Sequence, residues 1–205
     1  MKIVSTSDVP LEELRKFSAE LGAEFEVDVQ DSQVFQRSAE TPSWVALLAT
    51  ADWWVKGLAA YAALFVAEIV KEAAKDTWRH RAKASAAVTA AGGQFRKVGV
   101  AIAALRARLT ARTTVAVGLP VPDDYFATRL AVDGDDPDLL CAQLALFVHH
   151  LPALNVLMST HGLAEGRVAA GVYLSLNDDG SLLVSWHDPK TLEVTEHVLP
   201  LRPAV

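Results

Sequence analysis

The sequence predicts an α+β protein in which a mixed or antiparallel sheet accompanies a long, alanine-rich helical hairpin. Three observations predict it: strand-like alternation near the start, helical patterning over residues 41–112, and a return to strand-like segments from Thr113. We expect one domain over residues 1–205. It would consist of a β-α-β unit (1–40), a helical insertion (41–112) and a sheet-rich β-β-α-β-β-β region (113–205).

The N-terminal unit combines two strand patterns with one helix pattern. Residues 2–7, KIVSTS, resemble a short strand, and a helix with Pro10 in its first turn runs to the stop at Gly22. The next run, AEFEVDVQ at 23–30, alternates apolar and acidic residues, which is typical of a half-buried strand. We expect the two strands to belong to one sheet.

The insertion contains two predicted helices. Thr41-Pro42 is a good helix start, and the sequence Ala91-Gly92-Gly93 marks the clearest break. The run that follows, QFRKVGVAIAALRARLTAR, predicts a second helix that packs antiparallel to the first.

The C-terminal region returns to strands around one helix. TTVAVGL and FATRLAV are strand-like and are joined by the turn-rich PVPDDY. Asp136-Pro137 opens a helix that we expect Pro152 to interrupt, with a second piece running to Gly162. Three further strands would be joined by the turns NDDG and DPKT.

Charge is segregated along the chain, whose net charge is −6. Residues 71–112 carry ten Lys or Arg and only two Asp or Glu, whereas residues 1–40 carry four against nine and residues 113–205 four against twelve. This asymmetry indicates either an anionic partner for the basic middle or neutralisation by the acidic flanks within the same molecule. The sequence leaves both alternatives open.

The most ambiguous segment is WVKGLAAYAALFVAEIVKEAAKD at 54–76. Only the eleven residues from Gly57 to Ala67 run without a charge, whereas a membrane span needs about 20 predominantly apolar residues. We therefore expect a buried central helix first, and a partner surface or membrane surface second.

No catalytic, cofactor-binding or metal-binding motif is present in the sequence. The histidines lack the HExxH arrangement, and adjacent His149 and His150 are interpreted as capping a helix C-terminus before Pro152. The acidic cluster at 133–138 lacks the spacing of a calcium loop and is interpreted as helix capping. Cys141, the single cysteine, lies in an apolar run and predicts a small buried side chain.

These observations favour a cytoplasmic, non-enzymatic interaction protein without a cofactor. A signal peptide pattern is missing from the first residues, which leads us to expect the cytoplasm. The partner would be another protein or a second copy, and nucleic acid is not expected. The alternative is a membrane-associated effector whose segment 44–70 binds an anionic bilayer, and the third reading is an enzyme with an unrecognised site. Residues predicted for the partner or membrane surface are Trp44, Trp53, Trp54, Lys71, Lys75, Arg79 and Lys83.

Overall fold

A computed structural model of the chain describes a sheet with helices packed on it, and the statements below concern the residues whose placement it describes. These are residues 2–5, 9–21, 28–31, 44–48, 62–63, 66–67, 78, 94–109, 113–121, 124–163, 172–188, 191 and 193–201.

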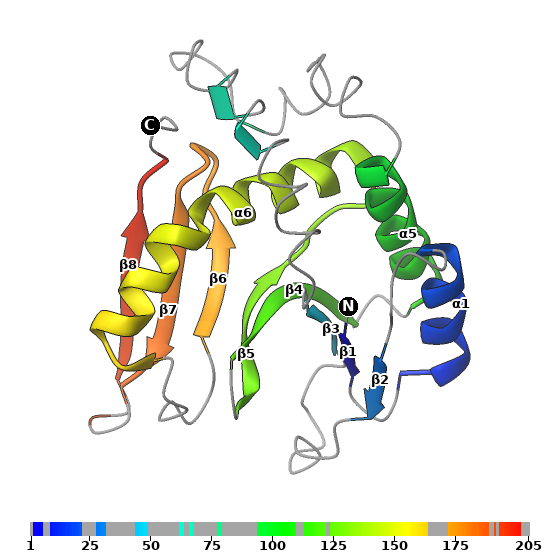
Figure 1. Cartoon of the computed structure of the whole chain (residues 1–205), viewed down its shortest axis with the longest axis horizontal. Helices are drawn as coiled ribbons and strands as arrows, with labels where there is room; N and C mark the ends of the chain where they lie inside the picture. The colour runs from blue at the N-terminus through cyan, green and yellow to red at the C-terminus, as the bar shows by residue number, and fades with distance from the viewer. Residues whose placement is uncertain are drawn as a thin grey trace.

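Eight strands among these residues form one mixed sheet in the order β2-β1-β3-β4-β5-β6-β7-β8 (Figure 1). Neighbours pair in parallel at β1–β2, β3–β4 and β5–β6, and antiparallel elsewhere. The strands are β1 Lys2–Ser5, β2 Asp28–Asp31, β3 Trp44–Leu48, β4 Thr114–Val121, β5 Asp124–Ala131, β6 Val172–Leu176, β7 Leu182–His187 and β8 Val194–Leu199. Helices together with this mixed sheet confirm the predicted α+β class.

Three helices lie along the sheet: α1 (Leu11–Leu21), α5 (Gln94–Arg108) and α6 (Pro137–Thr160). In Figure 1, α1 and α5 lie side by side. Helix α6 begins beside α5, where Pro137 lies close to Gly99, and extends across β6, β7 and β8. The buried side chains of α1, Leu14, Phe17 and Leu21, recur at the three- and four-residue spacing of one helical face. β1 and β2 are parallel neighbours and lie on either side of α1 in the chain.

Helix α6 begins as predicted but does not break at Pro152. Asp136 is its N-cap, with the side chain accepting a hydrogen bond of 2.9 Å from the backbone nitrogen of Asp138. The predicted interruption is wrong, because one helix continues through Pro152 to Thr160. Proline removes one backbone hydrogen bond, but Pro152 is exposed while Leu151 and Leu154 beside it are buried. Packing of the apolar side thus outweighs the local defect.

The predicted helix start at Thr41-Pro42 is also wrong, since residues 44–48 form β3. This strand pairs antiparallel with β1 and parallel with β4, so both of its edges are hydrogen-bonded. Val45 and Leu47 are buried in strand alternation. A five-residue apolar run carries no decisive periodicity, and pairing on both sides decides its structure. The predicted helical insertion at 41–112 therefore cannot begin before residue 49.

Little of the segment between β3 and α5 (residues 49–93) is described, and its described residues include both core and exposed side chains: Ala62, Val66 and Trp78 are buried, whereas Ala63 and Ala67 are exposed. Ala62 and Val66 are helical, lie one turn apart and are 2% and 0% exposed. Trp78 is also helical and is 1% exposed. One face of this segment therefore contributes to the core, while the predicted helix that is buried nearly all round stays a prediction. Most of the predicted first helix of the hairpin lies outside the described residues. The predicted second helix corresponds to α5, which packs against α1 and α6.

The C-terminal meander forms as predicted. β6, β7 and β8 pair antiparallel in sequence order, and the turn between β6 and β7 contains Gly180 at φ 81°, a backbone conformation that glycine adopts without strain. Helix α6 is the one described helix that is long and apolar enough to cross a membrane, and 67% of its apolar stretch is buried inside the protein. Such burial is that of a core helix.

Candidate functional site

The structure describes only one of the seven residues predicted for a partner surface. Trp44 is the first residue of β3, which lies between two other strands. The other six, Trp53, Trp54, Lys71, Lys75, Arg79 and Lys83, lie outside the described residues. Trp78, from the same aromatic stretch, is buried rather than presented to a partner.

The described part of the basic stretch is α5, and both acidic flanks neutralise it. Nε of Arg106 lies 3.2 Å from a carboxylate oxygen of Asp135, and Nε of Arg96 lies 3.4 Å from one of Asp138. Both acids precede or begin α6. The acidic cluster at 133–138 therefore caps α6, as predicted, and also pairs with α5.

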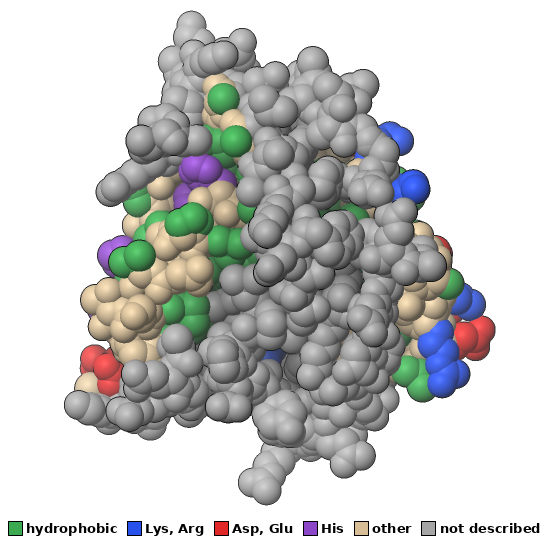
Figure 2. Space-filling view, in the orientation of Figure 1, with side chains coloured by type: hydrophobic (Ala, Val, Ile, Leu, Met, Phe, Trp, Pro, Cys, Tyr) green, Lys and Arg blue, Asp and Glu red, His purple; other side chains and the backbone are tan. Residues whose placement is uncertain are grey.

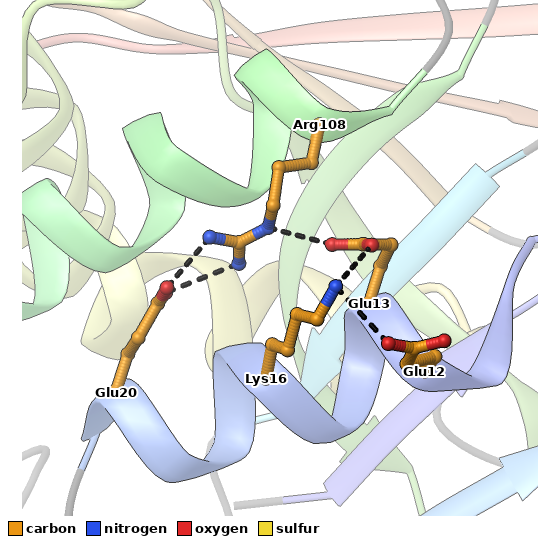
Figure 3. Close-up of polar contacts among 5 residues, drawn as sticks. All are labelled: Glu12, Glu13, Lys16, Glu20 and Arg108. Carbon is orange, nitrogen blue, oxygen red and sulfur yellow. Dashed lines mark hydrogen bonds and ion pairs between the residues drawn. The ribbon is translucent and has the colours of Figure 1, made fainter.

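The last residue of α5, Arg108, pairs with α1 (Figure 3). The guanidinium of Arg108 lies 2.6 Å and 3.1 Å from the two carboxylate oxygens of Glu20, and its Nε lies 2.8 Å from Glu13. Hydrogen bonding to Glu20 raises the pKa of Arg108 above its ordinary value. Lys16 completes the cluster by pairing with Glu12 at 3.2 Å and Glu13 at 2.9 Å. Of the two alternatives left open by the sequence, neutralisation within the molecule holds for these arginines.

A shallow groove of about 580 Å³ remains open beside these pairs, at the outer face of α5. Val100 in this groove is 45% exposed, and Lys97, one turn before it, is exposed and has no ion pair among the described residues. The edge of the molecule at α1 and α5 shows mixed basic and acidic side chains in Figure 2. The residues lining the groove are Glu20, Arg96, Lys97, Val100, Ala101 and Ala104.

This groove combines an apolar floor with a basic rim. Its floor is apolar and small, because residues 100, 101 and 104 lie on one face of α5. Its polar rim consists of the cations of Arg96 and Lys97, with the Glu20 carboxylate already engaged by Arg108. An apolar helix face with a carboxylate at its border matches both features.

Chemistry that would indicate an enzyme is not assembled in the described part of the chain. No group of three or more His, Cys, Asp or Glu there could hold a metal ion. Burial raises the pKa of the Cys141 thiol to about 11, which keeps it protonated and unreactive at neutral pH. The ring of His161 packs against Trp186 at 5.2 Å.

His150 is the side chain that the sequence interpretation placed wrongly. It does not cap a helix end, because it lies well inside α6, is 2% exposed and contacts the backbone oxygen of Gly180. His150 lies four residues from both Leu146 and Leu154, which are buried. A predicted helix that continued through Pro152 would therefore have placed the His150 ring on the same inward face.

Comparisons with known protein families, with curated proteins and with solved structures found no significant match to this chain.

Proposed function

We propose that the protein is a non-enzymatic, cytoplasmic interaction module that binds a partner polypeptide in the α1–α5 groove. The partner contributes a helix whose apolar face covers Val100, Ala101 and Ala104, with a carboxylate beside Lys97. The observation that carries the proposal is the exposed Val100 next to Lys97, which has no ion pair within the described part of the chain, on a helix whose arginines pair with acidic residues.

The proposed partner surface is the outer face of α5, whereas the sequence predicted it in the aromatic stretch. The sequence prediction relied on Trp44, Trp53, Trp54 and the basic row from Lys71 to Lys83, together with a helical hairpin over 41–112. In the described residues Trp78 and Val66 are core side chains, which supports a structural role for the segment before α5. In this proposal, the part of the predicted hairpin that precedes α5 serves only to support α5.

Two observations favour this function over the membrane alternative. The start of the segment 44–70 is β3, a strand paired on both sides, which cannot enter a bilayer without dismantling the sheet. Ala62 and Val66, further along, are already buried. An enzyme with an unrecognised site has no supporting cluster among the described residues.

Photo-crosslinking in the producing cells tests the proposal. Val100 is replaced by p-benzoylphenylalanine in the full chain, and Val156 on α6, a valine that is even more exposed at 68%, serves as the control. We expect one discrete adduct from position 100 and none from position 156. A mass equal to two copies would identify self-association, and another mass a different protein.

Charge reversal at Lys97 shows whether the adduct depends on the groove. Lys97→Glu should lower the yield about tenfold, the factor that corresponds to about 1.4 kcal/mol of binding free energy. The proposal would be contradicted if Lys97→Glu did not change the adduct yield from position 100, or if positions 100 and 156 gave equal adduct yields. Sedimentation of the protein with anionic liposomes, together with crosslinking of position 100 to lipid, would instead support the membrane alternative.

A further inference from the structure

The turn between β6 and β7 (residues 177–181) is a compact hydrogen-bonded unit. The backbone nitrogen of Asn177 donates to Ser181 at 2.9 Å, and that of Gly180 donates back to Asn177 at 2.9 Å. The carboxylate of Asp179 accepts from both the backbone nitrogen and the hydroxyl of Ser181, at 2.9 Å and 2.6 Å. The turn therefore presents fixed carbonyl oxygens to its neighbours.

Two elements far apart in the chain attach to those carbonyl oxygens. From α6, Nε2 of His150 lies 2.8 Å from the oxygen of Gly180, an arrangement in which the ring donates and the carbonyl accepts. From the segment before α5, the indole Nε1 of Trp78 donates to the oxygen of Asn177 at 2.9 Å. Since both contacts use the same short turn, opening one disturbs the anchor of the other.

The surroundings of His150 are unfavourable for a charged ring. It is 2% exposed, and the turn glycine that it contacts lies against Leu146 and Leu201: a Cβ at Gly180 would meet their methyl groups at 3.6 Å and 3.0 Å. Burial lowers the pKa of His150 below 6.5, although the Gly180 carbonyl acts in the opposite direction. Burial is the larger effect, so the folded protein holds the ring neutral.

The charged groups facing His150 do not offset that burial. His149, whose ring lies edge-on at 5.4 Å, would repel a second positive charge. Asp179 on the turn would attract one, but its carboxylate is engaged by Ser181, which lowers the pKa of Asp179.

We propose that His150 is an acid-sensitive latch: when its ring takes up a proton, the contact between α6 and the β6–β7 turn opens, and the indole of Trp78 is released from the same turn. This inference concerns α6 and the β6–β7 turn rather than the residues of α1 and α5 that line the groove, and it does not depend on the proposed function.

The direction of the pH dependence follows from linkage. A histidine that is held neutral in the folded state binds a proton more readily once exposed, so the opened form gains protons first as the pH falls below about 6.5. The equilibrium between latched and opened forms then shifts by about tenfold for each pH unit, down to the lowered pKa of the folded state. Above pH 6.5 this contribution is fully present and constant.

Hydrogen exchange of the Trp78 indole measures the latch directly. Its ¹⁵N–¹H signal is assigned with Trp78→Phe, and its exchange rate from pH 5 to 8 is divided by that of free tryptophan at each pH. We expect a constant protection factor above pH 6.5 and a loss of about tenfold per unit below it. His150→Gln, which keeps an N–H donor but does not titrate, should make the profile flat. His149→Gln should keep the loss below pH 6.5 but end it at a higher pH, because the repulsion that His149 exerts on a charged His150 is removed.

Ring titration of the wild-type protein provides a readout that does not require His150→Gln to fold. The His150 ring should remain neutral below pH 6.5 until the Trp78 signal responds. A His150 ring that becomes charged with the Trp78 indole still protected would overturn the proposal. So would a pH profile that is unchanged by His150→Gln.

Discussion

The α1–α5 edge and the β6–β7 turn are both held by polar contacts, but these differ in exposure and in partner. At the edge, Arg108 and Glu20 are 25% and 37% exposed and pair charge with charge. At the turn, buried His150 and Trp78 donate to backbone oxygens. Figure 2 shows the same division, with Lys, Arg, Asp and Glu at the α1–α5 edge and hydrophobic and histidine side chains over α6.

The difference shows which region provides stability and which provides a surface. An exposed ion pair contributes little net free energy, because water solvates both ions almost as well as they solvate each other. A buried donor that loses its acceptor, in contrast, retains its whole desolvation cost. We therefore expect substitutions near the turn to destabilise the fold strongly, and substitutions at the α1–α5 edge to change mainly binding.

The largest expected effect is that of Trp78→Ala. Truncating a buried tryptophan leaves a cavity, and we expect the free energy of unfolding to fall by about 3–5 kcal/mol in urea titrations. Trp78→Phe is the matched control, because it keeps an aromatic ring and removes mainly the hydrogen bond to Asn177, worth about 1 kcal/mol. A cost below 1 kcal/mol for Trp78→Ala would mean that Trp78 is not a core residue.

An intermediate effect is expected at Gly99, on the face of α5 that packs against α6. A Cβ there would lie 2.5 Å from the backbone oxygen of Pro137 and 2.7 Å from Sγ of Cys141, so the two helices must separate. Gly99→Ala should lower the melting temperature and cost about 1–3 kcal/mol. Val100→Ala, one residue away on the exposed face, is the control and should cost less than about 0.5 kcal/mol. Equal costs would remove the distinction between the two faces of α5.

The smallest effect is expected for Glu20→Gln at the α1–α5 edge. Removing this carboxylate leaves Arg108 paired with Glu13, so the free energy of unfolding should fall by less than about 1 kcal/mol. The difference from wild type should shrink further in 1 M salt, because the Debye length falls to about 3 Å there and charge–charge interactions between exposed groups are screened. A larger cost that salt does not reduce would show that the pair is effectively buried.

Sequence patterns predicted the elements whose periodicity is unambiguous. The helix at 11–21, the helix that opens at Asp136-Pro137 and the C-terminal strands are all present, because each combines a clear period with capping or turn residues. β3 was missed because five apolar residues fit a strand and a helix equally well until β1 and β4 lie on either side.

The groove and the turn contacts could not be predicted for a different reason. Each depends on residues far apart in the chain: Glu20 lies opposite Arg96, and Trp78 lies against Asn177. Charge counts revealed acidic flanks around a basic middle, but not which arginines the flanks reach. Lys97, unlike Arg96, Arg106 and Arg108, forms no ion pair with any residue that the structure describes.

The most direct measurement compares thiol labelling of two single substitutions, Val66→Cys and Val100→Cys. The native Cys141 is buried and should not react, so the wild-type protein provides the background. If the segment before α5 is core and the outer face of α5 is open, maleimide should label the Val100→Cys variant rapidly. The Val66→Cys variant should react about 100-fold more slowly, because labelling then requires local opening. Equal labelling rates in the two folded variants would contradict the assignment of core and surface on which the proposed function depends.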